Sequence, residues 1–200
     1  VHDKVGYYFL QKENVVLSNQ RMEGSWKIAN RQTTVPADIV RQDVFTLSID
    51  PGQSPYNGGY AYMVIPSVDS RSVENRVEEE GAVVLANSSE LQAVRHDGLN
   101  MAYAVFYKGG TLRINDKIAV EIESPGMLMM KYNDSGEIQM LAVSDPTHFM
   151  KKLHLSVNQK IDWAAQEGIQ TEWDKEKAFT RIVVDLPQDE YAGKSVIYNK

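Results

Sequence analysis

Apolar and polar residues alternate with a period of two along much of the chain, which is typical of β-strands. The stretch 43–66 shows this most clearly. Phe45, Leu47 and Ile49 share one face of a first predicted strand, because successive side chains of a strand point to opposite sides. A second predicted strand over 60–65, with the sequence YAYMVI, is apolar on both faces and therefore needs cover on both sides. We predict that 43–66 forms a hairpin inside a large layered β structure.

The residues before this hairpin predict further short strands. They lie at 5–10, 14–17 and 24–28, and Trp26, between two polar neighbours, is expected to be a buried strand residue. The polar segment 31–38 contains a proline and is predicted to be a loop.

The composition changes after Pro66. Residues 67–80 are mostly polar and predict one helix of about three turns, capped by Asp69 or Ser70 and stopped by Gly81. We place a domain boundary here, which gives domains at 1–80 and 81–200.

Short strands separated by turn signals recur from residue 82 onward, and two hairpin turns are expected, at 115–116 and 133–136. The expected strands lie at 82–87, 91–96, 101–107, 112–114, 117–122, 127–132, 137–143, 152–157, 179–186 and 196–198. The segment 158–177 breaks the rhythm and is expected to be a short helix or a long loop. This spacing predicts an all-β chain that ends in an antiparallel β-sandwich.

Composition narrows the function classes. The chain has 200 residues, a net charge of -6 and no cysteine, which removes disulfides, thiolate metal sites and cysteine nucleophiles. No basic cluster favours nucleic-acid binding, and no apolar run is long enough for a membrane span. The sequence begins at Val1 without an initiator methionine or a signal peptide, as an interior fragment or a processed product would.

The sequence contains no recognisable catalytic, metal or cofactor motif. The histidines His2, His96, His148 and His154 form no ligand spacing, and His96 is expected in a solvated turn. No nucleophile elbow is present, and residues 144–147 match a turn in which Asp and Ser side chains bond local amides. Glu121 and Glu123 are expected on a solvated strand face rather than across a glycosidase cleft.

Aromatic residues in polar stretches are the remaining candidates. Tyr56, Tyr132, Trp163 and Trp173 are such residues, and a flat aromatic face is a good platform for a sugar ring. The alternative is that each covers a corner of the core, and this interpretation is favoured. Tyr56, Trp163 and Trp173 are kept as candidate carbohydrate-binding residues.

Several stretches together resemble one enzyme family, polysaccharide lyase family 8, which includes chondroitin AC, hyaluronate and xanthan lyases. They are GYYFLQKENVVLSNQRMEGSWKIAN, VFTLSIDPGQSPYNGGYAYMVIP, LQAVRHDGLNMAYAVFYKGG, AVSDPT and VVDLPQDEYAGKSV. The resemblance covers nearly the whole chain, matches the C-terminal part of the family and is nearest to chondroitin AC lyase.

The resemblance implies a fold and an activity. Members carry an N-terminal α/α toroid, a β super-sandwich and a small C-terminal β-sandwich, and they cleave uronic-acid polymers such as glycosaminoglycans by β-elimination. Residues 1–80 would then hold the last super-sandwich strands and the linker helix, and 81–200 the C-terminal sandwich. The family's catalytic Tyr, His and Asn reside in the toroid and its cleft, so no catalytic residue is carried onto this chain. The resemblance further implies a bacterial, secreted or periplasmic protein, with the toroid of the same chain as partner.

Two departures from the family pattern stand out. Relatives often carry His-Gly where this chain has Pro51-Gly52, and the segment 158–177 is longer than in relatives. Two hypotheses therefore stay open: a non-catalytic C-terminal region of a glycosaminoglycan lyase that supports the catalytic cleft, or a stand-alone carbohydrate-binding or adhesion β-sandwich module.

Overall fold

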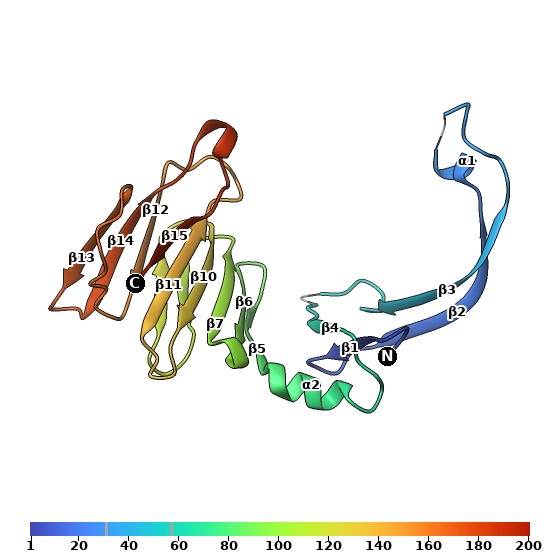
Figure 1. The fold of residues 1–200 in the computed structure, drawn as a ribbon, viewed down its shortest axis with the longest axis horizontal. Coiled ribbons are helices and arrows are strands. Elements are labelled where there is room, and N and C mark those ends of the chain that lie inside the picture. The colour runs from blue at the N-terminus through green and yellow to red at the C-terminus, as the bar shows by residue number, and fades with distance from the viewer. Residues whose placement is uncertain (31, 57) are drawn as a thin grey trace. The chain divides into compact units, whose positions relative to one another are not determined.

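The computed structural model describes residues 1–30, 32–56 and 58–200 and is drawn in Figure 1. The chain divides into two compact units, one made of Val1–Tyr8 with Val64–Lys200 and the other of Phe9–Met63. Strands paired in antiparallel sheets dominate both units, which confirms the all-β prediction.

Two long strands form the body of the smaller unit. β2 (Val15–Gly24) pairs with β3 (Val40–Ile49) over its full length, from Val15 opposite Ile49 to Gly24 opposite Val40. The predicted hairpin over 43–66 is therefore wrong in its pairing. The second strand of that stretch, β4 (Tyr62–Pro66), pairs instead with β1 (Val5–Phe9). Both β2 and β3 are ten residues long, so they offer each other a full ladder that the shorter β4 cannot match.

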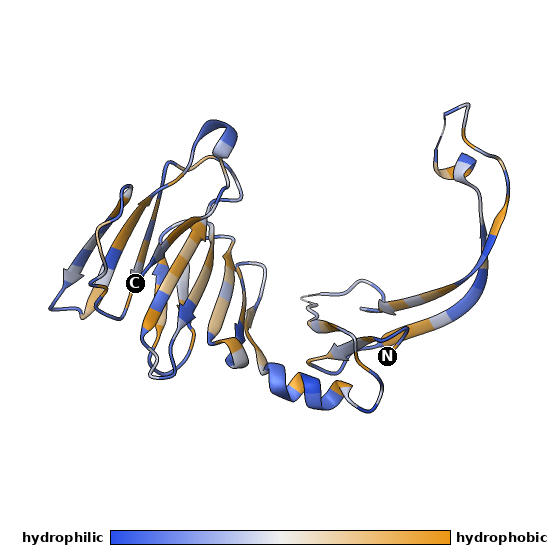
Figure 2. Cartoon of the chain, viewed as in Figure 1, coloured by the Kyte–Doolittle hydropathy of each residue, from blue (hydrophilic) through white to orange (hydrophobic). Residues whose placement is uncertain are grey.

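The expected alternation of faces is confirmed along these strands. Phe45, Leu47 and Ile49 are partly covered, and their outward neighbours on β3 are exposed. On β4, Ile65 is buried, whereas Tyr62 and Val64 remain exposed. Figure 2 shows apolar residues recurring along β2 and β3, where the exposed large side chains include Val16, Leu17, Met22, Val40 and Val44. The face of β4 that carries Tyr62 and Val64 stays exposed among the described residues, so the cover predicted for both faces of 60–65 is present on one face only.

Trp26 differs from its prediction. It begins the single-turn helix α1 (Trp26–Ala29) and is 67% exposed, not a buried strand residue. The Ser25 hydroxyl accepts a hydrogen bond from the amide of Lys27, and this cap starts a helix where the sequence pattern predicts a strand. Arg31, in the predicted loop 31–38, and Asn57, in the connection 51–59 between the two strands of the predicted hairpin, lie outside the described residues. The other residues of both segments form no helix or strand.

The predicted helix is present but shorter. α2 (Val73–Glu80) ends at Gly81, which adopts the left-handed conformation that the prediction required. Its N-cap is Ser72, so the proposal of Asp69 or Ser70 as cap is wrong. Asp69 instead accepts hydrogen bonds from the amides of Arg71 and Ser72, so it closes the turn that precedes the helix.

The larger unit contains two sheets of antiparallel strands that pack face to face. The six-stranded sheet has the order β15-β11-β10-β7-β6-β5. Its members are β5 (Ala82–Asn87), β6 (Leu91–His96), β7 (Met101–Phe106), β10 (Gly126–Tyr132), β11 (Ile138–Ser144) and β15 (Val196–Asn199). The five-stranded sheet has the order β13-β14-β12-β9-β8. Its members are β8 (Gly110–Arg113), β9 (Ala119–Ile122), β12 (Lys152–Val157), β13 (Ile169–Asp174) and β14 (Phe179–Asp185). Two 3₁₀ turns complete the unit, η1 (Asp97–Leu99) and η2 (Asp189–Tyr191).

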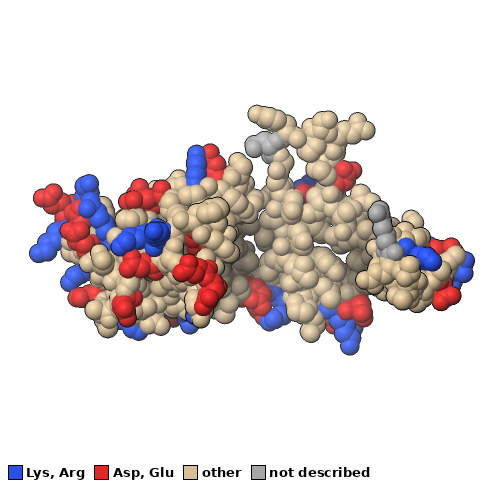
Figure 3. Space-filling view, turned by 90° about the horizontal axis from the view of Figure 1, so that it is seen from above, with Lys and Arg blue, Asp and Glu red and all other residues tan. Residues whose placement is uncertain are grey.

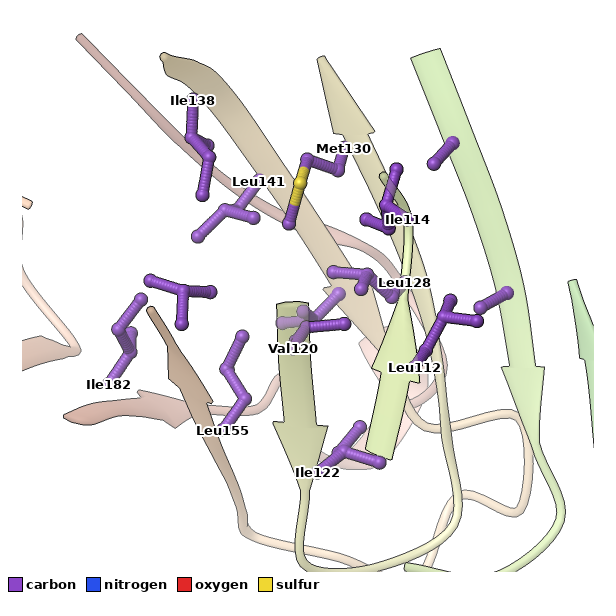
Figure 4. Packing of buried hydrophobic residues seen from close by; sticks show 14 of the residues in the cluster. Leu112, Ile114, Val120, Ile122, Leu128, Met130, Ile138, Leu141, Leu155 and Ile182 are labelled. Atoms are coloured by element: carbon purple, nitrogen blue, oxygen red, sulfur yellow. The ribbon is translucent and has the colours of Figure 1, made fainter. Parts of the chain in front are cut away.

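The sandwich core lies between these two sheets (Figure 4). The central strand β10 shows how the pattern builds it, because Leu128, Met130 and Tyr132 are buried while Met127 and Lys131 on the other face are exposed. Both expected hairpin turns are confirmed by the pairing of β8 with β9 and of β10 with β11.

One strand was missed. Within the segment 158–177, β13 pairs with β14 from Ile169 opposite Val184 to Asp174 opposite Phe179, which corrects the expectation of a helix or a long loop. β13 lies at the edge of its sheet and three of its six residues, QTE, are exposed, so its sequence lacks the apolar alternation of the inner strands.

Candidate functional site

The three candidate carbohydrate-binding residues belong to two different units of the chain. Tyr56 is 97% exposed in the smaller unit, whereas Trp163 and Trp173 belong to the sandwich. Trp163 packs against the core and its ring lies 4.7 Å from that of Tyr198, centroid to centroid. Trp173 is partly buried on the edge strand β13. For Trp163 the alternative interpretation, an aromatic that covers a corner of the core, fits its contacts. The sugar-binding role of all three residues stays a prediction.

Tyr132 is a core residue. Its ring is buried in the sandwich cluster, and burial raises the pKa of the Tyr132 phenol against the opposing effect of the Arg95 cation. It offers no platform to a ligand.

His96 does not lie in a solvated turn. It is the last residue of β6, and its Nε2 lies 2.7 Å from Oε2 of Glu80 in the last turn of α2. Because a carboxylate only accepts, Nε2 carries the proton and donates it. Nδ1 is buried and, among the described residues, has no hydrogen-bond partner. The pair attaches the helix to the sandwich. No local sequence pattern indicates this contact, because Glu80 and His96 lie on different elements and are 16 residues apart.

Asp145 is a buried acidic residue of the sandwich, and its carboxylate accepts four hydrogen bonds. One carboxylate oxygen accepts from the amide and the hydroxyl of Thr147, at 2.8 and 2.6 Å. The other accepts from the amides of Phe149 and Met150, at 2.9 and 2.8 Å. Burial raises the pKa of Asp145, but these four hydrogen bonds outweigh it and hold the pKa below its usual value. Asp145 bonds local amides as predicted for the turn at 144–147, whereas Ser144 is the last residue of β11 and has no such role in the part of the chain that the structure describes. The Asp145 carboxylate is saturated with donors and so is not free for acid–base chemistry.

A hollow of about 470 Å³ lies at one end of the sandwich. It is lined by the 3₁₀ turn η2, the start of β15 and the loop before β13, with Gln166, Gln188, Tyr191 and Lys194 as its polar or aromatic side chains. Sequence reasoning did not single out Tyr191. Tyr191, like Tyr56, is an exposed tyrosine in a polar stretch rich in turn residues, and only the structure shows that the surface is hollowed beside Tyr191.

The described residues contain no arrangement typical of a catalytic or metal centre. No group of three or more His, Asp or Glu side chains among them could hold a metal ion. Glu121 and Glu123 lie exposed at the end of β9, as predicted. Figure 3 shows acidic and basic side chains interspersed over the visible face of the sandwich, without a patch of one sign. Across the same residues, no helix has the length and apolar character that a membrane span requires.

Two family models match the chain one after the other. Residues 1–77 match the super-sandwich domain of polysaccharide lyase family 8, and residues 83–154 match the C-terminal beta-sandwich domain of the same family. These matches do not test the domain limits 1–80 and 81–200, which stay a prediction.

Curated relatives agree with the models. The chain is 32% identical over 196 residues to the chondroitinase-AC of Pedobacter heparinus, covering 98% of this chain and 25% of that protein. It is 28% identical over 158 residues to a hyaluronate lyase of Enterococcus faecalis, covering 76% of this chain and 15% of that protein. The chain thus spans a quarter or less of the length of these relatives.

Solved structures show the same fold. A chondroitinase AC lyase determined as an enzyme–oligosaccharide complex superposes with a TM-score of 0.81 at 32% identity, covering 99% of this chain and 27% of that one. A Streptomyces coelicolor chondroitin AC lyase superposes with a TM-score of 0.76 at 18% identity, covering 96% of this chain and 24% of that one, and this likeness shows the fold alone. The strands of the smaller unit and the sandwich of the larger unit agree with the two family models. The chain belongs to polysaccharide lyase family 8, in the region of its super-sandwich and C-terminal β-sandwich domains.

Proposed function

We propose that this chain is the non-catalytic C-terminal region of a glycosaminoglycan lyase that degrades uronic-acid polymers of the chondroitin or hyaluronan type by β-elimination. Its role is to support the catalytic cleft, which an α/α toroid of the same chain would supply. The observation that carries the proposal is the succession of the family's super-sandwich and C-terminal beta-sandwich domain models over residues 1–77 and 83–154. Export to the periplasm or the medium stays a prediction.

The exposed apolar side chains of the smaller unit support a scaffold role. Leu17 is 62% exposed on β2, and Val16 and Met22 on the same strand are also exposed. Soluble proteins rarely leave contiguous apolar patches uncovered, and each large side chain buried contributes about 1.5–3 kcal/mol. In the proposed role, further strands of the super-sandwich cover these side chains.

Mixed with chondroitin sulfate, the chain alone should give no rise in ultraviolet absorbance from unsaturated uronate, because the expected catalytic Tyr, His and Asn lie outside it. The chondroitinase-AC of Pedobacter heparinus serves as the positive control. A clear rise with the chain alone would overturn the non-catalytic role.

A graft tests the supporting role directly. The Pedobacter heparinus chondroitinase-AC is cut ahead of the region that aligns with this chain, and the chain is joined in its place. We expect the cut enzyme to be inactive and the graft to recover lyase activity. Leu17→Glu in the graft should lower the activity at least tenfold, because a charge then enters an apolar packing surface.

The control is Gln170→Glu, at an exposed polar position of the edge strand β13 and outside the smaller unit, which should leave the graft's activity unchanged. Equal activity of the graft and its Leu17→Glu variant would show that this face of β2 packs against nothing in the enzyme.

A further inference from the structure

The hollow at the end of the sandwich is a shallow, open depression with a mixed apolar and polar lining. Its volume of about 470 Å³ falls within the range of small-ligand pockets, roughly 300–1,000 Å³. Pro187, Val196 and Ile197 give it an apolar floor, and Ser195 and two glutamine side chains add polar groups.

An aromatic ring and a cation meet at its rim. Tyr191 is 59% exposed, and Nζ of Lys194 lies 5.7 Å from the centroid of its ring. A cation this close to an aromatic face is held there electrostatically. Among the described residues, none of the ion pairs involves Lys194, so its charge is available to a ligand.

Hydrogen bonds to backbone carbonyls hold the side chains that line the hollow in place. The amide nitrogen of Gln188 donates to the carbonyls of Met150 and Leu186, and that of Gln166 donates to the carbonyl of Ile197. Gly193 has a φ of +84° and lies against the imidazole of His148, where a Cβ would clash. The loop that carries His148 is itself held by the buried Asp145 carboxylate. The ligand would therefore meet a preformed surface, which lowers the entropic cost of binding.

We propose that this hollow binds one uronic acid unit of an acidic polysaccharide, as a chain-holding site that takes no part in the cleavage. The apolar face of the pyranose ring stacks on Tyr191, and the uronate carboxylate pairs with the Lys194 ammonium. The choice of ligand rests on the proposed function, but the site is defined by this chain's own residues. Asp189 and Glu190 lie exposed in the same turn and repel further negative charge, so the site takes a single acidic unit and binds it weakly, with a Kd in the millimolar range, about 1 mM.

The test follows backbone and side-chain amide signals of the 200-residue chain by NMR during titration with a hyaluronan tetrasaccharide. We expect saturable shifts at Gln166, Gln188 and residues 191–197. Tyr191→Ala should weaken binding about three- to tenfold through the lost stacking. Lys194→Gln should abolish the preference for hyaluronan over a neutral maltotetraose of the same length.

Tyr107 provides the matched control. It is an exposed tyrosine beside a lysine, as Tyr191 is near Lys194, but Lys108 already pairs with Glu90. Tyr107→Ala should leave the affinity unchanged. The amide signals of the sheets show whether each variant keeps its fold. We expect all variants to fold, because the Tyr191 and Lys194 side chains are exposed.

Absence of shifts around the hollow, or equal affinity in Tyr191→Ala, would overturn the site. The lyase assay of the graft is independent of this result. If the graft is active and the chain shows no shifts at the hollow, the binding site is excluded and the proposed function stands. If the graft is inactive and the chain shows saturable shifts, the proposed function is excluded and the binding site stands.

Discussion

Met130→Ala should lower the free energy of unfolding of the sandwich by about 2–5 kcal/mol. Met130 is 0% exposed and lies at the centre of β10, with Ala102 on one neighbouring strand and Leu141 on the other. Because the small Ala102 lies beside it, the methionine fills space that no neighbour can take over, and its removal leaves a cavity. Urea unfolding followed by the fluorescence of Trp163, which packs against the same core, measures the loss.

Met127 provides the control for this substitution. It lies on the same strand but on the outer face, where it is 40% exposed. Met127→Ala removes the same atoms and should cost less than about 1 kcal/mol, because little packing is lost. Similar losses for the two variants would contradict the assignment of the inner face of β10.

Asp145→Asn should lower the free energy of unfolding by about 2–4 kcal/mol at neutral pH. The amide of asparagine has one acceptor oxygen, so it cannot accept all four of the hydrogen bonds that reach the carboxylate, and its NH₂ group places donors among donors. Asp162→Asn, at an exposed residue whose carboxylate faces Lys160, is the control and should change stability by less than about 0.5 kcal/mol.

The same carboxylate predicts a pH dependence. Its pKa in the folded chain is lower than the ordinary value for aspartate, about 3.9. The stability that it contributes is therefore present above that ordinary value and is lost as the pH falls through the lower folded value. In Asp145→Asn, urea midpoints should fall less steeply than in the unaltered chain as the pH drops below the ordinary aspartate value. An equal slope would show that other carboxylates account for the acid response.

The sequence predicted the sandwich well where strands are covered on one face and solvated on the other. β5, β6 and β12 match their predicted limits. β12 alternates cleanly, with Leu153, Leu155 and Val157 buried, whereas β5 and β6 are delimited by the turn residues that flank them. The prediction failed where tertiary context decides. β13 is too polar to show a strand pattern, Trp26 follows a serine cap that outweighs its β-forming neighbours, and the partners of β3 and β4 depend on strands distant in sequence.

The candidate site was less predictable for a related reason. An aromatic residue in a polar stretch has the same local signal whether it packs on the core, as Trp163 does, or lines a hollow, as Tyr191 does. What separates them is the position of loops far apart in the sequence, such as Gln166 beside Ile197.

The pairing of β15 with β11 has a consequence for how the sandwich folds. Tyr198 lies opposite Leu141, and its ring is buried in the core that the earlier strands have built. On the ribosome, the six-stranded sheet therefore keeps an open edge at β11 until residues 196–199 emerge. Pairings of such long range close slowly, so an incomplete sandwich with an exposed strand edge persists during synthesis. This interval is when the nascent domain is most exposed to pairing with the wrong chain.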